Sequence, residues 1–138
     1  MVFSKRRFWM GHMSVLIVDD EPEIRSMLHE FFEDKGYRVL MAGNGEQALL
    51  AVKEEAPGLV LLDIRMPNMD GVETLRLIKE MRPETVVVMI SAYATIETAK
   101  QTLKLGAYDY IAKPFDLQHL ERIVEMIEAS ELPSSTMD

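Results

Sequence analysis

The sequence predicts an α/β fold in which helices cover both faces of a five-stranded parallel sheet. Short runs rich in Val, Ile and Leu alternate five times with longer segments whose apolar residues recur at helical spacing. Most of these runs lack the apolar-polar alternation of a half-exposed strand, as expected for strands buried on both faces. Strands that alternate with helices are joined by right-handed crossovers and form a doubly wound sheet.

The five strands are expected in order along the chain. The first, third and fourth are continuous apolar runs, which suits the centre of a sheet, and the fourth is the most β-branched. The second is shorter and more polar, which suits an edge. The expected ranges are Val15–Val18, Tyr37–Ala42, Leu59–Asp63, Thr85–Ile90 and Tyr108–Ile111.

The helices are expected where start and stop signals bracket an apolar stripe. Asp20-Glu21 supplies an acidic cap before Pro22 at the first helical position. Asn44 and Gln47 resemble a capping box for the second helix. The five helices are expected from Pro22 to Gly36, from Asn44 to about Glu55, after Asp70-Gly71 as far as Arg82-Pro83, from about Thr95 to Leu105, and from Leu117 to Ile127.

Two of these helices show features that bear on later sections. Gly36 and Gly106 are expected to end the first and fourth helices, because glycine adopts the left-handed conformation that closes a helix. The fourth helix carries Ile96, Ala99 and Leu103, which predict an apolar stripe along one side.

Length and composition are those of one globular domain. The chain has 138 residues, of which 48% are hydrophobic and 28% are charged. It has no cysteine, which excludes a disulfide framework and a thiolate metal site and suits a reducing compartment. The net charge of -8 argues against a nucleic-acid surface. No apolar stretch approaches the roughly 20 residues that span a bilayer, so no membrane contact through a spanning helix is expected.

The domain is expected to span residues 14–130. Residues 1–13 lack the apolar run of a secretory signal, and Gly11-His12-Met13 resembles a cloning scar. We expect them to be a leader that is tag-derived or disordered; the alternative is a basic and aromatic arm that touches a membrane or a partner. Residues 131–138 are small and polar, as is typical of a frayed tail or the start of a linker.

Polar residues stand at the carboxyl ends of four predicted strands. Asp19 and Asp20 follow the first strand, Asp63 ends the third, Ser91 follows the fourth and Lys113 lies beyond the fifth. The carboxyl ends of parallel strands meet at one edge of a sheet, where ligands bind. Three carboxylates there would repel one another and raise each other's pKa values, so a cation is expected. Mg²⁺ prefers carboxylate and phosphate oxygens, and no His or Cys cluster lies near these positions to favour zinc.

Each of these residues also has an ordinary structural explanation. Asp19 and Asp20 can cap a helix, and Asp63 can be a solvated loop residue. Ser91 can be an ordinary serine at the start of a helix, where its hydroxyl finds a hydrogen-bond partner. Lys113 can be a surface lysine ahead of a turn proline, to which it is joined by a bond that can be cis. Together the five residues favour a site for Mg²⁺ and a phosphoryl group, which the lysine ammonium and the serine hydroxyl would contact.

Five segments resemble the receiver domain of bacterial two-component response regulators. The resemblance covers Ser14 to about Ala129 and implies the flavodoxin-like strand order 2-1-3-4-5. It implies a phosphorylation-dependent signalling switch that is cytoplasmic and that catalyses only its own phosphorylation and dephosphorylation. The segments, in order, are Val15–Glu21, Leu61–Pro67, Met69–Gly71, Ile90–Ala92 and Tyr110–Phe115.

The resemblance implies the phosphoacceptor and the metal ligands. Asp63 would accept a phosphoryl group from a sensor histidine kinase or a phosphotransfer protein. Asp20 and Asp63 would ligate Mg²⁺ directly, Asp19 would act through water, and the backbone carbonyl of Arg65 would supply a further oxygen.

It also implies the residues that bind and report the phosphoryl group. Lys113 and Ser91 would contact the phosphoryl oxygens, and the ring of Tyr110 would move inward when Ser91 is drawn to the phosphate. Arg65 and Tyr93 are bulky and stand two residues beyond Asp63 and Ser91, so we expect them to control how water reaches the aspartyl phosphate.

The output surface is expected between about Thr95 and Ala129, on the fourth helix, the fifth strand and the fifth helix. This stretch contains Tyr110 and borders Ser91. It also carries side chains of both charges, which suits a self-dimer, although an ordinary solvated face would look the same.

Other functions fit the sequence less well. A Mg²⁺-dependent phosphatase of the haloacid dehalogenase kind would have a second aspartate where Arg65 stands, and this chain has no room for a substrate-covering cap. A flavin binder on the same fold would have a phosphate loop after the first strand, where Asp-Asp-Glu-Pro would repel phosphate. A receiver used only for docking would not need so complete a site.

Overall fold

The structure is a computed structural model that describes residues 14–65, 70–92 and 95–130. Its five strands form one parallel sheet in the order β2-β1-β3-β4-β5. This confirms the predicted strand order and fold class. The strand bounds are β1 Ser14–Val18, β2 Arg38–Ala42, β3 Leu59–Asp63, β4 Val86–Ser91 and β5 Asp109–Ala112.

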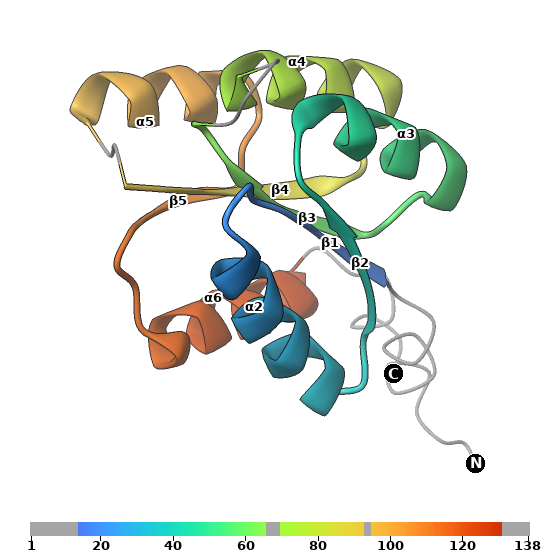
Figure 1. Ribbon diagram of the computed structural model, residues 1–138. Helices are drawn as coiled ribbons and strands as arrows, with labels where there is room; N and C mark the ends of the chain where they lie inside the picture. The colour runs from blue at the N-terminus through green and yellow to red at the C-terminus, as the bar shows by residue number, and fades with distance from the viewer. Residues whose placement is uncertain (1–13, 66–69, 93–94, 131–138) are drawn as a thin grey trace.

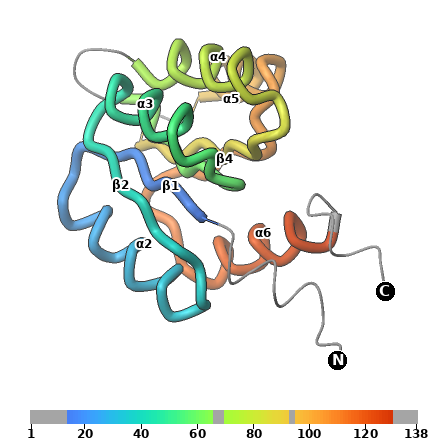
Figure 2. The backbone as a smooth tube through the Cα atoms, turned by 90° about the vertical axis from the view of Figure 1, so that its right-hand side faces the viewer, coloured from blue at the N-terminus to red at the C-terminus, as the bar shows by residue number. Residues whose placement is uncertain are grey.

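Five helices cover the two faces of this sheet. Helices α2 and α6 lie on one face, and α3, α4 and α5 lie on the other (Figure 1). The view at right angles shows the same three layers (Figure 2). The helix bounds are α2 Pro22–Asp34, α3 Gly45–Glu55, α4 Gly71–Met81, α5 Ile96–Lys104 and α6 Leu117–Ser130.

Each face of the sheet carries its own hydrophobic core. Successive residues of a strand point to opposite faces, so β1 divides its side chains between two clusters. Val15 and Ile17 pack with residues of α2 and α6. Leu16 and Val18 pack with residues of α3 and α4. All residues of β1, β3 and β4 are buried, as the continuous apolar runs predicted.

Several local predictions need correction. The N-cap of α2 is Glu21, but its side chain makes no capping hydrogen bond. Asn44 caps α3 as predicted by accepting from the Gln47 amide. However, the Gln47 side chain accepts from the amide of Gly43 rather than from that of Asn44, so the capping box is incomplete. Helix α5 has a capping box that was not predicted, formed by Thr95 and Thr98.

The ends of two helices follow the glycine signals. Gly36 and Gly106 have φ values of +92° and +106°, the left-handed conformation that most side chains resist. The predicted stripe of α5 is wrong in its orientation, because Ile96 and Leu103 are exposed to 76% and 48% while Thr102 is buried. Within the described ranges, no helix has the length and apolar character needed to cross a membrane.

Candidate functional site

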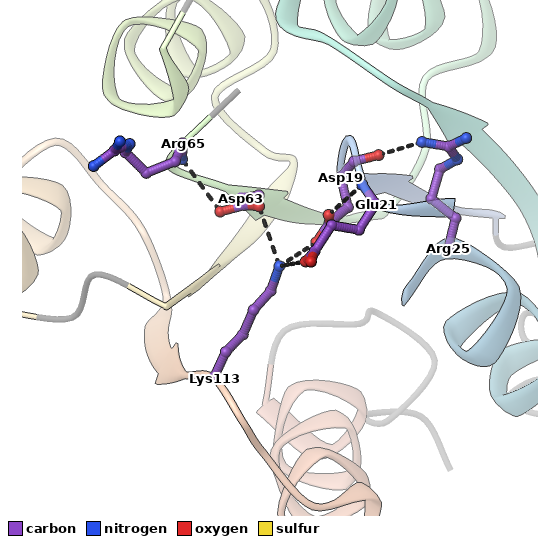
Figure 3. Close-up of polar contacts among 6 residues, drawn as sticks. All are labelled: Asp19, Glu21, Arg25, Asp63, Arg65 and Lys113. Carbon is purple, nitrogen blue, oxygen red and sulfur yellow. Dashed lines mark hydrogen bonds and ion pairs between the residues drawn. The ribbon is translucent and has the colours of Figure 1, made fainter. Parts of the chain in front are cut away.

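The carboxyl ends of four strands bring the predicted polar residues to one edge of the sheet. Figure 3 shows Asp19, Asp63 and Lys113 at this edge. Asp19 directly follows β1, and Asp63 is the last residue of β3. Ser91 is the last residue of β4, and Lys113 directly follows β5. The buried apolar residues that precede them in each strand fix where these side chains emerge.

The ammonium of Lys113 lies at the centre of this group. Its Nζ is 2.7 Å from Oδ2 of Asp19, 2.9 Å from Oε1 of Glu21 and 3.2 Å from Oδ2 of Asp63. Asp19 and Asp63 are buried, with exposures of 2% and 5%. Lys113 therefore links the carboxylates of two central strands to the edge strand β5. The Lys113–Pro114 bond is cis.

Backbone amides hold the other oxygens of the two buried carboxylates. Oδ1 of Asp19 accepts from the Glu21 amide at 2.9 Å, and Oδ1 of Asp63 accepts from the Arg65 amide at 3.2 Å. The Arg25 guanidinium donates to the backbone oxygen of Asp19 at 2.6 Å. These contacts fix the orientation of both carboxylates (Figure 3).

The pKa values of Asp63 and Lys113 are both raised, but for different reasons. Burial and then the charge of Asp19 raise the pKa of the Asp63 carboxyl, which Lys113 and the Arg65 amide lower only in part. Burial by itself would lower the pKa of the Lys113 ammonium. Hydrogen bonds to Asp19 and Glu21 and the charge of Asp63 outweigh it, and this pKa is raised. Lys113 is therefore cationic at neutral pH, while burial beside Asp19 disfavours the charged form of Asp63.

Three carboxylates converge closely enough to share a cation. Asp19, Asp20 and Asp63 each place an oxygen within 4.8 Å of the oxygens of the other two. Asp20 is exposed, so the cluster opens to solvent on one side. Oxygen ligands alone, with open positions for water, suit Mg²⁺. The residues present therefore fit the predicted magnesium site.

Gly71 allows helix α4 to begin directly against the end of β3. Its amide donates to the Ile64 carbonyl at 2.7 Å. A Cβ built at this position would clash with the carbonyl oxygen of Asp63 and lie 2.5 Å from Cα of Ile64. The backbone that carries Asp63 is therefore held by α4 at a distance that only glycine permits.

The remaining predicted residues lie on β4 and β5 or next to β3. Ser91 is fully buried, and its carbonyl oxygen accepts from the Lys113 amide at 2.8 Å. The hydroxyl of Tyr110 lies 3.1 Å from Oγ1 of Thr98. Arg65 is exposed beside Asp63. Tyr93 lies outside the described residues.

Three residues of this site were not predicted. The carboxylate of Glu21 reaches Lys113, Arg25 holds the backbone of Asp19, and Gly71 makes room for the backbone of Asp63. Glu21 and Gly71 had signals in the sequence, since each stands beside a predicted site residue or helix start. Arg25 had none, because arginine on a helix surface is common.

A model of one protein family matches most of the chain. The response regulator receiver domain matches residues 15–125. The chain belongs to the response regulator receiver family. Its acidic cluster of Asp19, Asp20 and Asp63 lies at the carboxyl ends of β1 and β3, and the receiver domain is a signalling module rather than a conventional enzyme.

Curated relatives agree with this membership. The receiver is 40% identical over 116 residues to sporulation initiation phosphotransferase F of Bacillus subtilis, a match that covers 84% of this chain and 94% of the relative. It is 44% identical over 111 residues to regulatory protein AtoC of Escherichia coli, which covers 80% of this chain and 24% of the relative. The chain thus spans about a quarter of the length of AtoC and of several other relatives.

Solved structures share the fold. A receiver domain protein from Methanospirillum hungatei has a TM-score of 0.83 at 30% identity, with 86% of this chain and 95% of that chain covered. A CheX–CheY complex of Borrelia burgdorferi with BeF3 and Mg²⁺ has a TM-score of 0.78 at 34% identity, covering 83% and 89%. The receiver is accordingly a phosphorylation-dependent switch, and its acidic cluster is consistent with a Mg²⁺ site.

Proposed function

We propose that Asp63 accepts the phosphoryl group. The observation that carries this proposal is the position of Lys113, whose ammonium pairs with the buried Asp63 at the centre of the sheet edge. Asp63 is the buried acid at the end of the central strand β3, and Asp19 and Asp20 lie beside it. A fixed cation next to a carboxylate nucleophile neutralises the charge that arrives with a phosphoryl group.

Asp19, Asp20, Asp63 and the backbone carbonyl of Arg65 would hold Mg²⁺. The bound ion supplies charge neutralisation for the phosphoryl oxygens and relieves the repulsion among the three acids. The closeness of the three carboxylates supports this assignment. The exposure of Asp20 leaves an open path by which the ion reaches the buried oxygens.

The donor is a phosphohistidine on a sensor histidine kinase or on a phosphotransfer protein. A carboxylate oxygen of Asp63 attacks phosphorus, the phosphorus–nitrogen bond breaks, and its electron pair leaves with the imidazole. Lys113 then exchanges its pairing with the Asp63 oxygen for a contact with a phosphoryl oxygen, and the Ser91 hydroxyl donates to another. The product is an acyl phosphate, which water can hydrolyse so that the switch resets.

Movement of Ser91 toward the phosphoryl group would be followed by an inward movement of Tyr110. The face formed by α5, β5 and α6, between Thr95 and Ala129, would carry the signal to an output domain or a partner in the cytoplasm. A second copy of this chain is one such partner. Arg65 and Tyr93 would control the access of water to the aspartyl phosphate and so its lifetime.

Phosphorylation by a small donor tests the assignment of Asp63. Incubation with acetyl phosphate and Mg²⁺ should add one phosphoryl group, detected by intact-mass spectrometry, and Asp63→Asn should abolish the addition. Asp70→Asn is the matched control, because Asp70 caps α4 close to the site and asparagine caps a helix equally well. An undiminished phosphoryl adduct on Asp63→Asn would disprove the assignment, as would a loss caused equally by Asp70→Asn.

A further inference from the structure

The side chain of Tyr110 is joined to helix α5 by a hydrogen bond outside the acidic site. Its hydroxyl lies 3.1 Å from Oγ1 of Thr98 in a partly buried position, and its ring packs against the core beneath α3 and α4. Thr98 is the third residue of α5. The contact therefore connects the edge strand β5 to the first turn of a helix of which only Thr102 is buried.

The hydroxyl of Thr98 also belongs to the cap of α5. It accepts from the Thr95 amide at 3.2 Å and lies 3.1 Å from the Thr95 carbonyl oxygen, to which it can donate. A hydroxyl donates one hydrogen bond and accepts two. Oγ1 of Thr95 lies 2.9 Å from the same hydroxyl as a further partner, and the Tyr110 hydroxyl, which can act as the donor, joins this group. The tyrosine is thereby tied to the start of the helix.

Tyr110 also stands on β5, the strand that leads to Lys113 and pairs with the strand that ends in Ser91. It lies three residues before Lys113, and its partner in the sheet is Met89, two residues before Ser91. The Lys113 amide donates to the Ser91 carbonyl at 2.8 Å. A displacement of either Lys113 or Ser91 therefore acts on the strand that holds Tyr110.

We propose that Thr98 is a latch that holds Tyr110 in its resting position. The hydrogen bond occurs in the arrangement in which Lys113 pairs with three carboxylates, as it does when Asp63 is an unmodified acid. The proposal rests on the proposed function, in which the Tyr110 ring moves inward on phosphorylation and breaks this bond. A bond present only in the resting form opposes switching by its net free energy.

The expected size of this effect follows from the usual strength of a hydrogen bond. A net contribution of about 1 kcal/mol corresponds to about a fivefold change in an equilibrium constant. Removal of the bond should shift the population toward the switched form by about that factor. A ligand that binds the switched form should then bind correspondingly tighter.

Binding of beryllofluoride with Mg²⁺, a phosphoryl mimic, measures this shift. The dissociation constant would be determined by NMR titration for the parent, Thr98→Val, Tyr110→Phe and the double variant. Each single substitution should tighten binding about fivefold, because each removes one partner of the same bond. The double variant should bind no tighter than either single variant. Thr98→Ser keeps the hydroxyl and should restore the parent affinity.

Thr102→Val is the control for a general loosening of α5. Thr102 lies one turn beyond Thr98, and its hydroxyl bonds to the carbonyl oxygens of Thr98 and Ala99. The substitution Thr102→Val should leave the affinity for beryllofluoride within about twofold of the parent. An equal tightening in Thr102→Val would assign the effect to helix stability and overturn the latch.

Two further outcomes would overturn the proposal in different ways. Unchanged or weaker binding in Thr98→Val, with a normal response of the parent, would remove the latch but leave the phosphoacceptor assignment intact. Tighter binding in Thr98→Val without tighter binding in Tyr110→Phe would have the same consequence. Failure of the parent to bind beryllofluoride, or equal binding by Asp63→Asn, would instead refute the proposed function. The latch proposal, which rests on that function, would then be refuted with it.

Discussion

Helices α4 and α5 cover the same face of the sheet but are attached to it in different ways (Figure 1). Helix α4 buries Leu75 and Ile78 completely and begins at Gly71, whose backbone lies against the end of β3. Helix α5 buries only Thr102 and leaves its largest apolar side chains in solvent. A hydrogen bond between Thr98 and Tyr110 joins this helix to the sheet.

The strands beneath these helices also differ in how deeply they are buried. All five residues of β3 are buried, whereas β5 is an edge strand in which only Ile111 is buried. Regions with few buried apolar contacts open locally at low free energy. The acidic cluster is thus built on the tightly packed part of the sheet, while the surface proposed for output lies on the loosely packed part. Lys113, at the end of β5, joins the two.

Truncation of one leucine in each helix should show the largest contrast. Leu75→Ala should lower the free energy of unfolding by about 3–4 kcal/mol, because a fully buried leucine leaves a cavity when it is truncated. Leu103→Ala should cost less than about 1 kcal/mol, since nearly half of that side chain is already exposed. Urea denaturation measures both values. Similar losses in the two variants would mean that α5 is packed as firmly as α4.

Gly71→Ala should have the next largest effect. The added methyl meets the backbone of Asp63 and Ile64, which cannot move aside as a flexible side chain can. We expect a loss of about 2–3 kcal/mol, together with slower phosphorylation because α4 would push on the residue that carries the acceptor. Urea denaturation and intact-mass kinetics with acetyl phosphate measure the two effects.

Gly43→Ala is the matched control for that substitution. A Cβ at Gly43 would have its nearest neighbour, Nη1 of Arg25, at 3.5 Å, an ordinary contact with a flexible side chain. Its stability and phosphorylation should stay close to those of the parent. If Gly71→Ala behaved in the same way, the close approach of α4 to β3 would not constrain the site.

Much of the tightly packed part could be predicted from the sequence. The bounds of β3 agree with the prediction at both ends, because its apolar run from Leu59 to Leu62 lies between Gly58 and the polar Asp63 and is fully buried. Asp19, Asp20, Asp63 and Lys113 were placed together because parallel strands bring their carboxyl ends to one edge.

The loosely packed part could not be predicted as well. The stripe of Ile96 and Leu103 suggested a buried side for α5, but the buried residue is Thr102. A threonine can lie inside because its hydroxyl bonds to backbone carbonyls of its own helix. The contact between Glu21 and Lys113 joins residues 92 positions apart and leaves no local pattern in the sequence.

The smallest effect on stability is expected from the charge of Asp63, which lies in the tightly packed part of the sheet. Burial and the neighbouring Asp19 raise the pKa of Asp63 above its ordinary value of 3.8, so its ionised form destabilises the folded protein. In a chelator, Asp63→Asn should therefore raise the free energy of unfolding at pH 7, because the amide carries no charge to desolvate or to be repelled by Asp19.

The dependence of this gain on pH has a definite sign. The folded state binds the proton more tightly than the unfolded chain, so the contribution of Asp63 to stability falls as pH rises between the unfolded and the folded pKa. The gain from Asp63→Asn should thus be complete above the folded pKa and vanish below about pH 3.8, where Asp63 is protonated in both states. Urea denaturation across this range measures it, with Asp70→Asn as the control. A gain that persists at low pH would arise from packing or hydrogen bonding of the amide, whereas a loss at pH 7 would mean that the pairing with Lys113 outweighs burial and repulsion.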